Sequence, residues 1–148
     1  MRVALGADHR GHDALQQLLP LFEQRGVELV EVADCGGATC DYPDVAAKVC
    51  RAVVAGRAQR GVLLCGTGAG SCLAANKVHG IRAAQAQDEI AAEAARGYLD
   101  VNVLCLAADL LGPRLVERIV VTFLETTFVG GRHSLRLEKL ARLEVAGE

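Results

Sequence analysis

The chain has 148 residues, of which 51% are hydrophobic and 3% aromatic, with no tryptophan. This length is enough to bury one sizeable core, so we expect a single domain over residues 1–148. A net charge of −2 leaves no electrostatic footprint for nucleic acid or an anionic membrane surface, and no apolar stretch approaches the ~20 residues that span a bilayer.

The six cysteines, at positions 35, 40, 50, 65, 72 and 105, include no CxxC pair and lie mostly inside apolar segments. This spacing predicts reduced thiols rather than a disulfide framework or a zinc site. The chain also opens directly on an apolar segment, without a signal-peptide pattern. These features together predict a cytoplasmic protein.

The first half of the chain alternates apolar runs with segments of helical periodicity. In order, it predicts a strand at residues 3–7, a helix at 13–25, a strand at 27–32 and a helix at 43–55. Gly26 suits the C′ position after the first helix, and Pro43 suits the first turn of the second.

The second half repeats this alternation. It predicts a strand at 61–65, a helix at 70–77, a strand at 81–85, a helix at 89–96, a strand at 101–107, and helices at 113–126 and 133–144. Such alternation is typical of an α/β protein whose parallel sheet is covered by helices on both faces. The last helix follows no strand and is amphipathic, so we expect it to pack on another subunit.

The most informative segment is Cys65-Gly66-Thr67-Gly68-Ala69-Gly70, which follows the apolar run at 62–64. A strand that passes through a glycine-rich turn into a helix presents free backbone N–H groups to an anion. The cysteine lies beside that positive helix end, which favours the reactive thiolate form. A plain tight turn is the alternative, although it needs fewer glycines. We expect a nucleophile or base beside an oxyanion cradle.

A dinucleotide fingerprint is a competing interpretation of this loop, because Asp88 follows it by about twenty residues. However, the third glycine of a GxGxxG pattern falls at Ser71, and the loop follows the third predicted strand rather than the first. The pattern therefore does not favour a dinucleotide.

Asp8 and His9 follow the first predicted strand, at the sheet edge where ligands of parallel α/β proteins bind. We expect them to contact a polar ligand, and the alternative is helix capping by Asp8 with solvated histidines. His9 and His12 lack a third ligand of suitable spacing for a metal.

Arg132 and Arg136 follow the hinge-like pair Gly130-Gly131 and, being four residues apart, share one face of the last helix. Two guanidinium groups on one face suit a phosphate, and a solvated basic face is the alternative.

Six motifs occur in order along essentially the whole chain: Asp8-His9-x-Gly11, Asp41-Tyr42-Pro43, Cys65-Gly-Thr-Gly-x-Gly70, Ala74-Ala-Asn-Lys77-x-x-Gly80-Ile-Arg82, Asn102-Val-Leu104 and Gly130-Gly-Arg-His-x-x-Arg136. Together they resemble the ribose-5-phosphate isomerase B / galactose-6-phosphate isomerase family of sugar-phosphate isomerases. The resemblance implies a Rossmann-like three-layer α/β/α sandwich with a five-stranded parallel sheet and an extended C-terminal helix. It also implies no metal or organic cofactor, and a homodimer or homotetramer with sites at the subunit interface.

The reaction implied by the resemblance is aldose–ketose interconversion of a phosphorylated sugar through a cis-enediolate. Its default pair is ribose 5-phosphate and ribulose 5-phosphate, a reaction of the pentose phosphate pathway. Cys65 would be the base that moves the proton between C1 and C2, and Thr67 with the loop amides would hold the oxyanion. The implied substrate-binding residues are Asp8, His9, Tyr42, Gly66, Gly68, Ala69, Gly70, Asn76, Arg132 and Arg136.

The chain departs from the family pattern at three positions. Family members carry a His-Asn pair, whose histidine is assigned to opening the furanose ring, where this chain has Tyr98 and Leu99. Tyr98 is therefore the candidate at a catalytic position, although a phenol is a poor proton shuttle at neutral pH. After the fifth predicted strand, Asp109 occupies the position at which family members have an arginine that binds the phosphate of the substrate.

These departures leave two hypotheses open. In the first, the chain is an active isomerase with an altered substrate, such as a tetrose phosphate that needs no ring opening, or a hexose phosphate. In the second, the chain is a non-catalytic sugar-phosphate-binding module or a subunit that depends on a partner chain.

Overall fold

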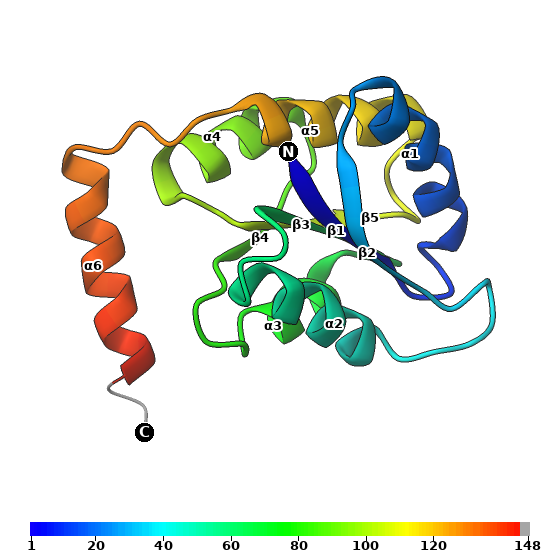
Figure 1. The fold of residues 1–148 in the computed structure, drawn as a ribbon, viewed down its shortest axis with the longest axis horizontal. Helices are drawn as coiled ribbons and strands as arrows, with labels where there is room; N and C mark the ends of the chain where they lie inside the picture. Colours follow the sequence, from blue (N-terminus) through cyan, green and yellow to red (C-terminus); the bar gives the residue numbers. More distant parts are fainter. Residues whose placement is uncertain (146–148) are drawn as a thin grey trace.

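The computed structural model describes residues 1–145, and within them strands and helices alternate as the sequence predicts (Figure 1). In chain order the elements are β1 (Arg2–Ala7), α1 (His12–Gln24), β2 (Glu28–Asp34), α2 (Tyr42–Val54), β3 (Arg60–Cys65), α3 (Ala69–Ala75), β4 (Ala83–Gln85), α4 (Glu89–Leu99), β5 (Val103–Ala107), α5 (Pro113–Glu125) and α6 (Arg132–Val145).

The expected boundaries differ from the observed ones by up to three residues, and local structure explains two of these differences. β4 begins at Ala83 rather than at 81, because the Asn102 side chain accepts the Arg82 N–H at 2.8 Å and holds that residue outside the strand. α4 continues to Leu99, and Asp100 ends it in the left-handed conformation with φ 47°.

The five strands form one parallel sheet in the order β2-β1-β3-β5-β4. Helices α1, α4 and α5 cover one face, and α2 and α3 cover the other (Figure 1). Residues along a strand alternate between the faces: Val62 and Leu64 join the core under α1, α4 and α5, whereas Leu63 joins the core under α2 and α3. The expected α/β/α sandwich is confirmed.

This topology places the candidate site. The chain leaves β1 through α1 on one face and leaves the neighbouring β3 through α3 on the other. The two loops therefore separate above the carboxyl ends of β1 and β3, and such a switch point is where open α/β sheets bind ligands. Asp8 and Cys65 lie on either side of it.

α6 extends away from the three layers and stands beside the β4 edge of the sheet (Figure 1). It exposes Leu135, Leu140 and Leu143 to solvent. Between α6 and the sheet edge lies a groove of about 320 Å³, lined by Leu137 and Leu140 on the helix and by Ile81 and other apolar residues opposite. No helix within residues 1–145 is both long and apolar enough to cross a membrane.

Gly11, which precedes α1, approaches β3 so closely that a side chain cannot be placed there. A Cβ atom on this residue would lie 2.4 Å from the Leu64 carbonyl oxygen. We expect Gly11→Ala to lower the free energy of unfolding by about 1–3 kcal/mol, because overpacking forces the loop and strand apart. Urea denaturation monitored by circular dichroism measures this change.

Gly112→Ala is the matched control, since Gly112 likewise precedes a helix and has open space around its Cα. Its substitution should change stability by no more than about 0.5 kcal/mol. Equal stability of the two variants would show that the close contact at Gly11 does not exist.

Candidate active site

The carboxyl end of β3 holds the loops of both neighbouring strands. The Asp8 N–H donates to the Leu64 carbonyl at 3.2 Å, so the loop after β1 is attached to β3. On the other side, the Ala108 N–H donates to the Cys65 carbonyl at 2.9 Å and the Asp109 N–H to the Gly66 carbonyl at 3.0 Å. Three loops thus meet at Cys65, the residue that the sequence analysis predicts to be the base.

The glycine loop turns at Gly68, which has φ +78°, a conformation that favours glycine. Gln85, the last residue of β4, supports the turn by donating its side-chain amide to the Thr67 carbonyl at 2.6 Å. The N–H groups of the first helical turn have no intrahelical acceptor. Those of Ala69 and Gly70 donate to no acceptor within residues 1–145. The loop therefore offers oriented donors, as the anion cradle requires.

Cys65 is the last residue of β3 and is buried, with 4% of its surface exposed. Two further thiols, Cys72 on α3 and Cys105 on β5, belong to the core on the α2 and α3 face of the sheet. A hydrogen bond from Cys105 lowers the pKa of Cys72 to about 7, with smaller contributions from the Gln85 backbone and Asn76. That bond and burial raise the pKa of Cys105 well above its usual range. Cys72, on the helix that follows the glycine loop, is therefore a thiol of near-neutral pKa that the sequence did not reveal.

Asp8 is buried, and its Oδ1 accepts hydrogen bonds from the backbone N–H groups of Arg10 at 2.9 Å and Gly11 at 3.0 Å. These bonds order the loop before α1. Asp8 is not the N-cap residue of the helix, because that position is held by Gly11. Both bonds use the same carboxylate oxygen, and Oδ2 accepts no hydrogen bond from residues 1–145. Asp8 Oδ2 can therefore accept a hydrogen bond from a hydroxyl group of a ligand at the switch point.

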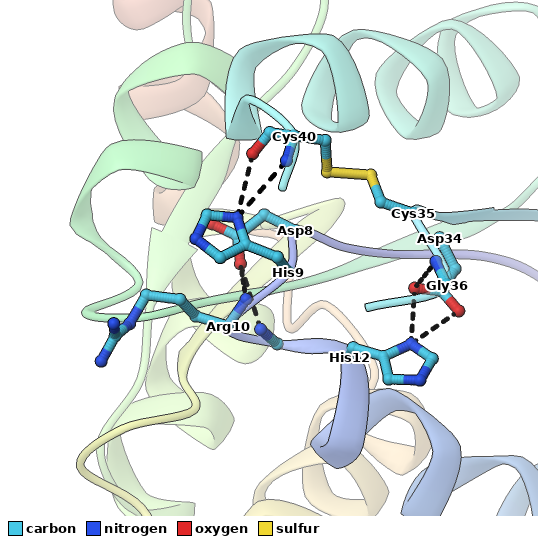
Figure 2. Close-up of a disulfide and its surroundings, with 9 residues drawn as sticks. Asp8, His9, Arg10, His12, Asp34, Cys35, Gly36 and Cys40 are labelled. Carbon is cyan, nitrogen blue, oxygen red and sulfur yellow. Dashed lines mark hydrogen bonds and ion pairs between the residues drawn. A yellow bond between two sulfur atoms is a disulfide. The ribbon is translucent and has the colours of Figure 1, made fainter. Parts of the chain in front are cut away.

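His9 lies beside a disulfide that the sequence did not predict. Cys35 and Cys40 are bonded to each other, so the expectation that all six thiols are reduced is wrong for this pair. Their loop turns through the left-handed residues Gly36 and Gly37, which brings the two sulfur atoms together. The His9 ring then meets the Cys40 backbone, with Nδ1 3.2 Å from the carbonyl oxygen (Figure 2).

Two other predicted binding residues lie on the α2 and α3 side. The Tyr42 ring covers Gly70, whose Cα faces it so closely that a Cβ there would lie 2.9 Å from the ring. Asn76 is engaged with the backbone: its amide donates to the Ala83 carbonyl at 2.9 Å and accepts the Ala83 N–H at 2.9 Å. Tyr42 therefore borders the glycine loop, whereas Asn76 joins the end of α3 to β4.

Arg10 and Asp109 form an ion pair across the first residue of the glycine loop. Nε and Nη2 of Arg10 both lie 2.6 Å from Oδ2 of Asp109. A Cβ on Gly66 would lie 2.8 Å from that oxygen and 3.0 Å from Nε. The hydrogen bond and charge of Asp109 raise the pKa of Arg10. The sequence marked Asp109 as a departure but did not identify Arg10 as its partner.

The remaining predicted residues lie far from Cys65, towards the amino ends of the strands. Tyr98 is at the end of α4, which returns the chain to the amino end of β5, and its ring stacks on His133 of α6 at a centroid distance of 4.9 Å. Arg132 and Arg136 are exposed on the same first turns of α6. One chain therefore contains two separate groups of candidate residues, one around Cys65 and one around Tyr98.

Asp88 and His12 both make side-chain contacts within the chain. The Asp88 carboxylate caps α4 by accepting the Ala91 N–H at 2.7 Å. His12 does not approach His9 but binds the carboxylate of Asp34, with Nδ1 2.9 Å from its oxygens (Figure 2). Within residues 1–145, no group of three His, Cys, Asp or Glu side chains is arranged to hold a metal ion.

Comparison with known proteins agrees with the family that the sequence motifs resemble. The model of the Ribose/Galactose Isomerase family matches residues 3–140. The chain is 38% identical over 145 residues to D-erythrulose-4-phosphate isomerase of Pectobacterium atrosepticum, covering 97% of this chain and 95% of that protein. It is 35% identical over 143 residues to ribose-5-phosphate isomerase B of Escherichia coli, covering 97% and 96%. The structure of Clostridium thermocellum ribose-5-phosphate isomerase B superimposes with a TM-score of 0.97 at 37% identity, covering 100% of both chains.

The disulfide should contribute measurably to stability. It links cysteines five residues apart, and closing so short a loop is worth about 2 kcal/mol. We expect dithiothreitol to lower the free energy of unfolding of the wild-type protein by that amount. The double variant Cys35→Ser/Cys40→Ser is the control: its stability should be lower and independent of the reductant. A reductant effect of the same size in the double variant would contradict the assignment.

Proposed function

The chain belongs to the Ribose/Galactose Isomerase family, and on this premise we propose that it interconverts ribose 5-phosphate and ribulose 5-phosphate. Its relatives are sugar-phosphate isomerases, and it is an aldose–ketose isomerase. The observation that carries the proposal is the position of Cys65, at the end of β3 beside a loop of free N–H groups.

In the proposed reaction, Cys65 acts as the base. Its thiolate accepts the proton from C2 of the open-chain aldose, and the C2 electron pair forms the C1–C2 double bond of the enediolate. As this double bond forms, the electron pair of the C1 carbonyl moves onto O1. The thiol then returns the proton to C1, the C2 carbonyl forms as O2 loses its proton, and O1 takes up that proton directly or by exchange through solvent. A positioned proton shuttle of this kind contributes typically ~10²–10⁴-fold in rate.

The glycine loop stabilises the charge that develops on oxygen. The N–H groups of Ala69 and Gly70 are already oriented before the reaction, so no reorganisation is needed when the enediolate forms. The exposed Thr67 hydroxyl lies on the same loop and is a further hydrogen-bond donor. Asp8 Oδ2 accepts a hydrogen bond from a sugar hydroxyl. Burial of Cys65 keeps water away from the intermediate.

A second copy of the chain supplies the rest of the site in this proposal. Arg132 and Arg136 lie at the opposite edge of their own sheet from Cys65, yet they are exposed and form no ion pair with residues 1–145. The exposed leucines of α6 and the apolar groove beside it suit packing against another subunit. A homodimer in which α6 reaches the partner's glycine loop would place both guanidinium groups on the phosphate.

A tetrose 4-phosphate is the second candidate substrate. Ribose 5-phosphate closes a furanose ring through O4, whereas a tetrose 4-phosphate carries its phosphate on O4 and stays open. Tyr98 and Leu99 supply no imidazole to open a ring, and the Tyr98 ring is stacked on His133. The similarity to an enzyme named for erythrulose 4-phosphate agrees with this candidate.

Turnover of a panel of four- to six-carbon sugar phosphates tests the proposal. We expect conversion of ribose 5-phosphate, and Cys65→Ala should reduce kcat on every substrate by at least ~10²-fold because the proton shuttle is lost. Cys50→Ala is a control that removes a buried thiol of α2 outside the site. Conversion of the tetrose phosphate alone would replace the default substrate, and unchanged activity of Cys65→Ala would refute the assigned base.

Mixing two inactive variants tests the shared site. Co-expressed Cys65→Ala and Arg132→Ala chains should recover about one quarter of the wild-type activity, because about half of the dimers are mixed and one of the two sites in each mixed dimer is intact. The doubly substituted chain is the control and should remain inactive. If the mixture shows no recovery although mixed dimers form, Arg132 does not act across the interface.

A further inference from the structure

Arg10 is a cation at the glycine loop that the proposed mechanism does not use. The loops that meet at Cys65 cover residues 8–11, 66–70 and 108–112, and Arg10 is their one permanently charged cation. Its position is fixed by two contacts. The Arg10 N–H donates to Asp8 Oδ1 at 2.9 Å, and Nε and Nη2 lie 2.6 Å from Asp109 Oδ2.

The ion pair leaves much of the guanidinium available. A guanidinium carries five N–H donors in a planar fork, and Asp109 engages two of them through one oxygen. The Arg10 side chain is 58% exposed, and it extends away from the disulfide side of the site (Figure 2). Three donors therefore remain for a further anion, and an arginine held by a carboxylate needs little reorganisation to bind one.

The geometry points to Arg10, oriented by Asp109, as a ligand of the substrate's phosphate group at the rim of the Cys65 site. This inference rests on the proposed sugar-phosphate function and assigns the anionic end of that substrate. The enediolate forms beside buried Cys65, where the loop amides are the nearest donors. A dianionic phosphate suits the exposed rim, because it keeps part of its hydration there.

The carboxylate of Asp109 lets a phosphate-binding role of Arg10 be distinguished from a purely structural one. With Arg10 present, Asp109 is neutralised and holds the fork in place. With Arg10 removed, the Asp109 carboxylate would stand unpaired against Gly66 and repel the phosphate. Loss of the arginine alone should therefore be worse than loss of both partners. If the Arg10–Asp109 ion pair contributed only to stability, the single and double variants would not differ in this order in their affinity for substrate.

The test compares four proteins: wild type, Arg10→Ala, Asp109→Asn and Arg10→Ala/Asp109→Asn. The readouts are kcat and KM for the best sugar phosphate, and the inhibition constant of inorganic phosphate. We expect Arg10→Ala to raise KM and the phosphate inhibition constant by about 10- to 100-fold, with kcat nearly unchanged. The double variant should recover part of this loss, and Asp109→Asn should bind phosphate at least as tightly as wild type.

Arg25→Ala is the matched control, because Arg25 also forms an exposed ion pair with a carboxylate, that of Glu125. It should leave KM and phosphate inhibition unchanged. Equal effects of Arg10→Ala and Arg25→Ala would overturn the inference. A fall in kcat with unchanged KM and phosphate inhibition would also overturn it, because it would place Arg10 at the reacting carbons.

Failure of the proposed function can be distinguished from failure of this inference. If the wild-type protein converts no sugar phosphate, the proposed function is wrong, and calorimetric titration with inorganic phosphate still tests Arg10. Weaker phosphate binding by Arg10→Ala than by Arg25→Ala would then support the anion site. If the wild-type protein is active and Arg10→Ala matches it in every readout, only the inference about Arg10 is wrong.

Discussion

The backbone carbonyls at the end of β3 organise the site. Leu64, Cys65 and Gly66 each accept an N–H group from a neighbouring loop, so the loops after β1 and β5 are fixed to the residue between them. These bonds are possible because β3 lies at the centre of the sheet with β1 and β5 on its two sides. Gly11 permits the closest approach, because it has no side chain to meet the Leu64 carbonyl. Without this arrangement, Asp8, Arg10 and Asp109 would not face one glycine loop.

Charge at this edge is balanced within the chain. Asp8 is stabilised by two backbone N–H groups, and Asp109 by the guanidinium of Arg10. An anionic ligand therefore meets two carboxylates whose charge is already compensated. At the other edge, Arg132 and Arg136 are exposed on a helix that stands apart from the body. This distribution of charge is the basis of the proposal that a phosphorylated substrate binds between two chains.

Most of the fold follows from local patterns. The period of the apolar residues distinguishes strands from helices, and Gly26 and Pro43 mark ends that the structure has within one residue of the expected positions. The position of Cys65 and Asp8 at one edge follows equally, because parallel strands all present their carboxyl ends on the same side. Cysteine spacing gave the wrong result for Cys35 and Cys40. The spacing of two cysteines does not show whether left-handed residues between them bring the sulfur atoms together.

By itself, the sequence determined the α/β architecture, the glycine loop with its buried cysteine, and the family to which those motifs belong. These features depend on interactions within a few residues or on a periodic pattern, and both are visible in a linear chain. Only the tertiary structure decided which side chains face one another. Arg10 meets Asp109 from 99 residues away, Tyr98 meets His133, and Asn76 binds the backbone of β4. Such pairings depend on strand order and on how loops are held over the sheet, and no local sequence signal encodes them.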